Sequence, residues 1–216
     1  MKICAISDTH GKHRMIDLGL IPADVDMLVH TGDMTWTGEY DVLADFNEWL
    51  QELSWIEHKI VIGGNHDKSL ERQRGLAQAI LSNASYLEDD LIEIDGFKIY
   101  GSPWAPRFGN WGFYADRGLE MAKKWRHLTS GQVKPDILLT HTPPYGILDM
   151  VDSGQNVGCE ELAKAIRIVN PKLHVFGHIH EGYGRYRERA DSTIFVNAAI
   201  CDGKYRPLNK PQIITL

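Results

Sequence analysis

The chain has few cysteines, and they lie far apart. Among 216 residues only three are cysteine, Cys4, Cys159 and Cys201, and none forms a Cys-x-x-Cys pair. This odd number and wide spacing argue against a disulfide framework and against a thiolate zinc site. We therefore expect a protein of the reducing cytoplasm.

Long apolar runs and an excess of positive charge are also missing. No segment approaches the roughly 18 consecutive apolar residues of a membrane helix, and the apolar stretch at the N-terminus is too short for a signal-peptide core. Lys and Arg number 23 against 29 Asp and Glu, which gives a net charge of −6. We expect no membrane association and no non-specific binding to nucleic acid, because both require a surplus of basic side chains.

Short apolar runs recur along the chain and predict buried strands. Their length and β-branched content suit strands of an α/β protein, and they lie at 3–6, 27–29, 60–62, 137–139, 173–176 and 194–196. Amphipathic patterns at 43–53 and 162–169 predict helices between them. Asp95-Gly96 is typical of a tight hairpin. No linker or repeat divides the sequence, so we expect one α/β domain over residues 1–216, with mixed sheets covered by helices.

Immediately after five of these runs come polar side chains that could bind a metal ion. They are Asp8 and His10, Asp33, Asn65 with His66 and Asp67, His141, and His178 with His180. Ligands gather beyond the carboxyl ends of strands in α/β sheets, so we expect these side chains to converge. Nitrogen and oxygen donors without sulfur favour Mn²⁺, and Fe, Zn²⁺, Co²⁺ or Ni²⁺ would also fit. Seven of these nine side chains would be enough to hold two divalent metal ions.

In this order, the five blocks resemble the signature of the calcineurin-like metallophosphoesterases. Further segments are similar to the small MPPED-type phosphodiesterases, namely Gly101-Ser102-Pro103-Trp104, Trp111-Gly112-Phe113, Val157-Gly158-Cys159 and residues 171–184. The resemblance implies a four-layered αββα sandwich. It also implies one metal ion held by Asp8, His10 and His180, a second held by Asn65, His141 and His178, and Asp33 bridging the two. His66 would be the catalytic histidine.

The chemistry expected from this set is hydrolysis of a phosphate ester. Two metal ions acidify a shared water and neutralise charge in the transition state, so a bridging hydroxide would attack phosphorus while His66 assists the departing oxygen. We expect a phosphodiesterase for small esters such as cyclic nucleotides. The alternatives are a phosphomonoesterase or Ser/Thr protein phosphatase with the same metals, and a non-catalytic scaffold. Gly32-Asp33-Met34 lacks the Asp-Arg-Gly motif of protein phosphatases, and a scaffold would usually have lost ligands.

Several side chains have two interpretations. The aromatic segment 102–117 is either plain packing or a wall on which a nucleobase stacks, with Trp104 as the substrate-binding ring and Arg107 or Arg117 near phosphate or ribose. Asp67 either caps a helix predicted over 68–81 or takes part in catalysis. We expect His13, His58 and His127 at the surface. His30 and His174 lie within apolar runs and are expected in the core.

Overall fold

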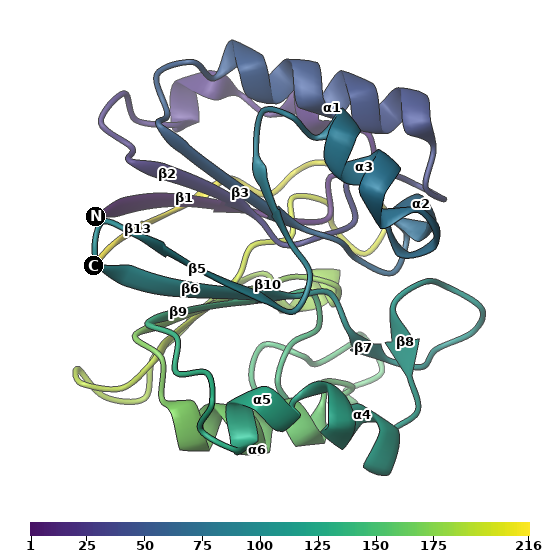
Figure 1. Cartoon of the computed structure of the whole chain (residues 1–216), viewed down its shortest axis with the longest axis vertical. Coiled ribbons are helices and arrows are strands. Elements are labelled where there is room, and N and C mark those ends of the chain that lie inside the picture. Colours follow the sequence, from purple (N-terminus) through teal and green to yellow (C-terminus); the bar gives the residue numbers. More distant parts are fainter.

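Two β-sheets packed face to face form the centre of the molecule, and helices cover the outer face of each sheet (Figure 1). The structure is a computed structural model and describes residues 1–216, apart from the side chain of Ala77. The αββα arrangement implied by the motifs is confirmed. None of the described helices is long and apolar enough to cross a membrane.

The first sheet is parallel except at one edge. Strands β1 to β4 run parallel to one another, and β13 pairs antiparallel with β1. Across the sheet the order is β13 (Gln212–Thr215), β1 (Lys2–Ile6), β2 (Met27–His30), β3 (His58–Ile62) and β4 (Ser85–Leu87).

The second sheet has a parallel centre and antiparallel edges. Its order is β11 (Gly184–Tyr186), β12 (Ile194–Asn197), β10 (Leu173–Phe176), β9 (Ile137–Thr140), β6 (Phe97–Ser102) and β5 (Asp90–Ile94). The predicted hairpin is present, because β5 and β6 are joined by the turn at Asp95-Gly96. All six strands predicted from apolar runs are confirmed. A separate parallel pair consists of β7 (Ala105–Pro106) and β8 (Tyr114–Ala115).

The helices form the outer layers (Figure 1). Those over the first sheet are α1 (Tyr40–Glu52), α2 (Lys68–Arg72) and α3 (Arg74–Ile80), and those over the second are α4 (Leu119–Lys124), α5 (Arg126–Thr129) and α6 (Glu160–Val169). Three short 3-10 helices are η1 (His13–Met15), η2 (Leu18–Leu20) and η3 (His180–Gly182).

Alternation along the strands divides the buried side chains among three layers. On β1, Ile3 and Ala5 belong to the cluster between the two sheets, whereas Cys4 and Ile6 pack in the cluster beneath α1. A third cluster, which includes Trp125, lies between the second sheet and α4 to α6. Successive side chains of a strand point to opposite faces. The central strands are therefore buried on both faces, which explains their continuous apolar runs.

Two expectations about local structure are wrong. The helix predicted over 68–81 is interrupted at Gln73, whose backbone (φ −140°, ψ 60°) is not helical and separates α2 from α3. His13 is fully buried rather than at the surface, because its ring packs against Phe46 and lies 2.8 Å from a carboxylate oxygen of Asp45 on α1. Only the tertiary packing of η1 against α1 creates that environment.

Candidate metal centre

The side chains that follow β1, β2 and β3 meet those that follow β9 and β10. Asp33 lies among them: its Oδ1 is 3.4 Å from His141 Nε2, and its Oδ2 is 3.9 Å from the Nε2 atoms of both His10 and His66. Three groups have potential ligand atoms that all lie within 4.8 Å of one another, and they are Asp8–His10–His180, His10–Asp33–His66 and Asp33–His141–His178.

Asn65 belongs to the same assembly. Its amide oxygen lies 2.9 Å from His141 Nε2, on the side of the site that also holds His178. The structure thus brings together all seven side chains that the sequence singled out as metal ligands. It also places His66, the predicted catalytic histidine, beside Asp33.

Backbone carbonyls orient two of the histidines. The Nδ1 atom of His141 lies 2.9 Å from the carbonyl oxygen of Thr31, and Nδ1 of His180 lies 2.9 Å from that of Asp202. A hydrogen bond from Nδ1 to a carbonyl leaves Nε2 as the free nitrogen and fixes the direction of its lone pair. Both Nε2 atoms face the cluster. Neither carbonyl could be found from sequence, because Thr31 and Asp202 carry no motif.

Much of the ligand set sits on unusual backbone. Asp8, His10, Asp33 and His178 have φ values of 51°, 44°, 58° and 66°, in the left-handed region that non-glycine residues seldom adopt. Such conformations persist where the surrounding fold enforces them, and they concentrate at functional sites. They turn the chain sharply at the end of each strand and so direct the side chains inward.

Two glycines beside the ligands are required by close packing. A Cβ atom at Gly177 would lie 2.7 Å from Ser7 Cβ and would overlap the carboxylate of Asp8, and one at Gly64 would lie 2.8 Å from His141 Cε1. Any side chain at either position would displace a predicted ligand.

The charge balance of the cluster fits divalent cations. Asp8 and Asp33 are buried, and no described Lys or Arg side chain forms a hydrogen bond or ion pair with either. Burial alone would raise the pKa of Asp8, but the hydrogen bond and charge of His180 outweigh it and hold the pKa below its ordinary value. Buried carboxylates need a compensating positive charge, which either protonated histidines or a bound cation can supply. Asp, Asn and His donors at these separations would supply ligands for such an ion.

The histidine pKa values follow the same carboxylates. Burial lowers the pKa of His141, but the charge of Asp33 and its hydrogen bond prevail and raise it to about 9. Burial also lowers the pKa of His180, and the hydrogen bond and charge of Asp8 raise it to about 9. For His10, burial dominates and lowers the pKa to about 4. Without cations, the carboxylates thus hold protons on two of the rings.

Asp67 ties two ligand loops together. Although it precedes α2, its side chain makes no hydrogen bond to that helix, so helix capping is not its role. Its carboxylate accepts hydrogen bonds from the backbone of both loops and from one hydroxyl, the donors being the N–H groups of Asp33, Met34, Thr35 and Gly64 and the hydroxyl of Thr35. The loop after β2 and the loop after β3 are thereby fixed relative to each other.

A cavity of about 520 Å³ opens over the cluster. Its floor includes Asp33, His66 and His180, and its described walls include aromatic side chains, namely Phe108, Trp111, Tyr114 and Tyr205. The segment 102–117 therefore does contribute to the wall, although a short strand pair organises part of it. The sequence did not single out Tyr205, which lines the cavity, or Trp36, whose ring centroid lies 4.6 Å from that of Tyr205.

The structure places Trp104 elsewhere, which corrects the choice of substrate-binding ring. Its Nε1 atom donates a hydrogen bond to Asp89 at 2.8 Å, its ring packs against Phe113, and Lys124 lies over it. Trp104 is not among the described residues that line the cavity. Trp111 belongs to one of the segments that resemble the MPPED-type phosphodiesterases, but the aromatic pattern alone does not say which ring faces the cavity.

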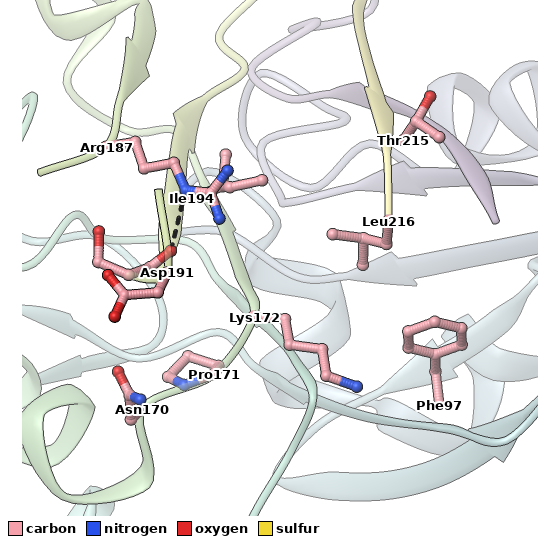
Figure 2. Close-up of a pocket in the computed structure, with 10 residues that line it drawn as sticks. Phe97, Asn170, Pro171, Lys172, Arg187, Asp191, Ile194, Thr215 and Leu216 are labelled. Atoms are coloured by element: carbon pink, nitrogen blue, oxygen red, sulfur yellow. Dashed lines mark hydrogen bonds between the residues drawn. The ribbon is translucent and has the colours of Figure 1, made fainter. Parts of the chain in front are cut away.

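A second cavity, of about 420 Å³, lies near the C-terminal strand (Figure 2). Its basic side chains are already engaged: Lys172 pairs with Asp136 at 2.9 Å, and Arg187 Nε donates to the carbonyl oxygen of Ser192 at 3.1 Å. The donor clusters described above all lie outside this cavity.

Comparisons with known proteins agree with this geometry. A family model described as calcineurin-like phosphoesterase matches residues 1–182. The human protein Metallophosphoesterase domain-containing protein 1 is 39% identical over 240 aligned residues, which cover 100% of this chain and 71% of the human one.

Solved structures share the fold at low sequence identity. The protein TT1561 of Thermus thermophilus has a TM-score of 0.66 at 17% identity and covers 91% of this chain and 88% of its own. Phosphopantetheinyl hydrolase from Mycobacterium tuberculosis has a TM-score of 0.58 at 14% identity, with coverage of 98% and 95%. The family match and the human relative together show that the chain belongs to the calcineurin-like phosphoesterase family.

Proposed function

We propose that this protein is a dinuclear metal-dependent phosphodiesterase that hydrolyses small phosphate esters, including cyclic nucleotides. The observation that carries the proposal is the convergence of seven nitrogen and oxygen donors around Asp33 beneath an open cavity. Asp8, His10 and His180 would hold one ion, Asn65, His141 and His178 the other, and Asp33 would contact both. Mn²⁺ suits this donor set. Bound there, two divalent cations supply charge neutralisation for the phosphate and lower the pKa of water.

His66 would assist the leaving group. Its Nδ1 atom lies 2.6 Å from the carbonyl oxygen of Trp36, which holds that nitrogen as a donor and turns Nε2 toward Asp33 and the cavity. With Nδ1 as a donor to the carbonyl, Nε2 carries a proton only in the imidazolium form, and in that form it can donate a hydrogen bond or its proton to an oxygen leaving phosphorus and become the neutral ring, a contribution of about 10² to 10⁴ in rate.

The basic side chains that line the cavity are already paired, and this favours a diester over a monoester. Arg107 is paired with Asp116, and Arg117 is held by Glu160 at 2.6 Å and by two backbone carbonyls. Glu181 adds a carboxylate to the wall. A monoester dianion would gain from an unpaired cationic side chain beyond the metals, and both lining arginines are already engaged. A singly charged diester has no such requirement.

The size and lining of the cavity support a nucleotide-sized ligand. Its volume of about 520 Å³ falls within the range of small-molecule sites. The exposed ring of Phe108 and the ring of Tyr114 lie in its wall and could stack with a base or another flat group.

The test combines metal analysis with a substrate panel. The purified protein, loaded with Mn²⁺, should contain about two ions per chain and hydrolyse bis-(p-nitrophenyl) phosphate faster than p-nitrophenyl phosphate. A panel of cyclic and linear nucleotide esters and a phosphopeptide would rank the substrates. Preference for the monoester or the phosphopeptide would favour the alternative phosphatase functions. A metal-loaded protein that cleaves none of them would contradict the proposal and favour a non-catalytic scaffold.

Two substitutions separate the proposed roles. Asp33→Asn should lose metal and activity together, because Asp33 is placed to contact both ions. His66→Ala should retain metal and lose turnover on esters with poor leaving groups. Normal turnover by His66→Ala on such esters would contradict the assignment of His66.

A further inference from the structure

We infer that Trp111 is a positioning residue, whose indole ring fixes the plane of the His66 imidazole so that Nε2 faces the departing oxygen. The inference rests on the proposed function, in which His66 assists the leaving group. Trp111 lies in one of the segments that resemble the MPPED-type phosphodiesterases, but that resemblance assigned no role to its ring, and its contact with His66 is visible only in the structure.

The two rings are stacked. The centroids of His66 and Trp111 are 4.0 Å apart, and their planes differ by 28°. Lys68 Nζ lies 4.5 Å from the centroid of the same indole, a cation–π contact that adds to its placement. Trp111 is half-buried and lines the cavity, so it occupies the boundary between the catalytic histidine and the space for substrate.

The backbone next to Trp111 holds it in this place. The N–H of Gly112 donates a 2.8 Å hydrogen bond to the carbonyl oxygen of Asn65, the residue before His66. Phe113 is fully buried and packs so closely on the end of β3 that a Cβ atom at Gly63 would lie 2.7 Å from its ring. The segment 111–113 is therefore docked against the very loop that carries His66.

The other contacts of His66 leave its ring plane less well defined. The hydrogen bond from Nδ1 to the Trp36 carbonyl fixes one ring atom, but carbonyl oxygens accept over a broad range of directions. His10 meets the ring edge to face, with centroids 4.7 Å apart, and the Trp36 ring is tilted by 57° against it at 5.6 Å, so neither lies flat on the imidazole. A flat indole over the imidazole face resists tilting that these contacts permit. Small errors in the direction of a catalytic group are costly in rate.

The test is the dependence of rate on the leaving group. For the metal-loaded protein, kcat would be measured on methyl aryl phosphates whose leaving groups are p-nitrophenol, p-chlorophenol and phenol. Proton donation matters most for the poorest leaving group, so Trp111→Ala should lower kcat on the phenyl ester by about tenfold and change the p-nitrophenyl ester little. Trp111→Phe should restore most of the rate, because a flat ring remains.

A double mutant shows whether Trp111 acts through His66. Once His66 is removed, loss of Trp111 should cost nothing further, so the variant with both residues changed to Ala should match His66→Ala. Trp55→Leu is the matched control, since Trp55 is 40% exposed and lies outside the cavity lining. Equal loss of rate on all three esters, or an additive effect in the double mutant, would overturn the inference.

A measurement without turnover complements the kinetics. In the metal-free protein, the ring protons of His66, assigned by their absence in His66→Ala, should resonate upfield because of the Trp111 ring. Trp111→Leu should move them downfield, and unchanged positions would overturn the inference. If instead His66→Ala loses the same fraction of the native rate on all three esters, the proposed role of His66 fails. The two failures are therefore distinguishable.

Discussion

The Nε2 atoms of His10 and His180 lie 3.3 Å apart in the interior of the candidate metal centre, and Asp8 Oδ1 lies 3.3 Å from the same atom of His180. Two imidazole nitrogens and a carboxylate oxygen directed at one point are the arrangement that a shared cation requires. The opposing group of Asn65 and His141, on the other side of Asp33, has the same character.

Removal of one ligand should therefore remove one ion. His180→Ala should reduce the metal content by about one equivalent per chain and leave the other site occupied, because Asn65, His141 and His178 do not depend on it. Elemental analysis after dialysis gives the answer, with the surface variant His127→Ala as the control. Retention of the full metal content in His180→Ala would contradict the proposed division of ligands.

Metal binding should release protons. In the metal-free protein the pKa values of His141 and His180 are raised to about 9, so both rings carry protons at pH 7, whereas a metal ligand must be unprotonated. We expect release of about two protons on loading at pH 7, and an affinity that rises as the pH approaches 9. Titration calorimetry in buffers of different ionisation enthalpy measures this number. His141→Ala should lower it by about one, and zero release by the native protein would refute the prediction.

Asp67 should be important for stability as well as for the position of Asp33. Asp67→Ala leaves the buried donors of two loops without an acceptor, and we expect the free energy of unfolding to fall by about 3 kcal/mol. Asp67→Asn keeps an acceptor oxygen and should lose less. Urea denaturation of the metal-free proteins provides the values. If the alanine variant is as stable as the native chain, the two loops are fixed by other contacts.

Acid should destabilise the protein through His174. Burial lowers the pKa of this histidine to about 3, from its ordinary value of 6.5. The unfolded chain then binds a proton that the folded chain does not. Stability is present above pH 6.5 and falls as the pH drops toward 3, by about 1.4 kcal/mol per pH unit. The free energy of unfolding, obtained from urea denaturation between about pH 7 and 4.5, should depend less steeply on pH in His174→Gln, by the equivalent of about one proton. His127→Gln controls for the loss of a surface histidine, and equal slopes in the native protein and His174→Gln would exclude the effect.

The sequence predicted the layers of the fold and the convergence of the ligands for one physical reason. Buried parallel strands read as short apolar runs, and the carboxyl ends of such strands share an edge, so the polar residues after them must meet. This reason covers ligands within one sheet, such as Asp8 and Asp33 after β1 and β2. Asp33 and His141 follow strands of different sheets, and only the resemblance implied that the two sheets pack so that these residues meet. Neither step required knowledge of any side-chain contact.

What the sequence could not supply depends on partners remote in the chain. Trp104 is directed by Asp89, and His13 is buried by Phe46 and Asp45, contacts that exist only after the sheets and helices have packed. The left-handed backbone of the ligand loops is likewise imposed by tertiary structure. Asp67 looked like a helix cap by position, yet its carboxylate is used by the loop after β2.

The ligand set draws on both sheets, and that division has a mechanical consequence. Asp8 and His10 follow a strand of the first sheet and His180 follows a strand of the second. A cation shared by the three would therefore cross-link His10 and His180, which lie 170 residues apart in the sequence. Removal of the cations by a chelator should therefore weaken the contact between the ligand loops of the two sheets, and faster proteolysis would report it. The concentration of divalent ions would then determine the resistance of the protein to proteolysis as well as its proposed activity.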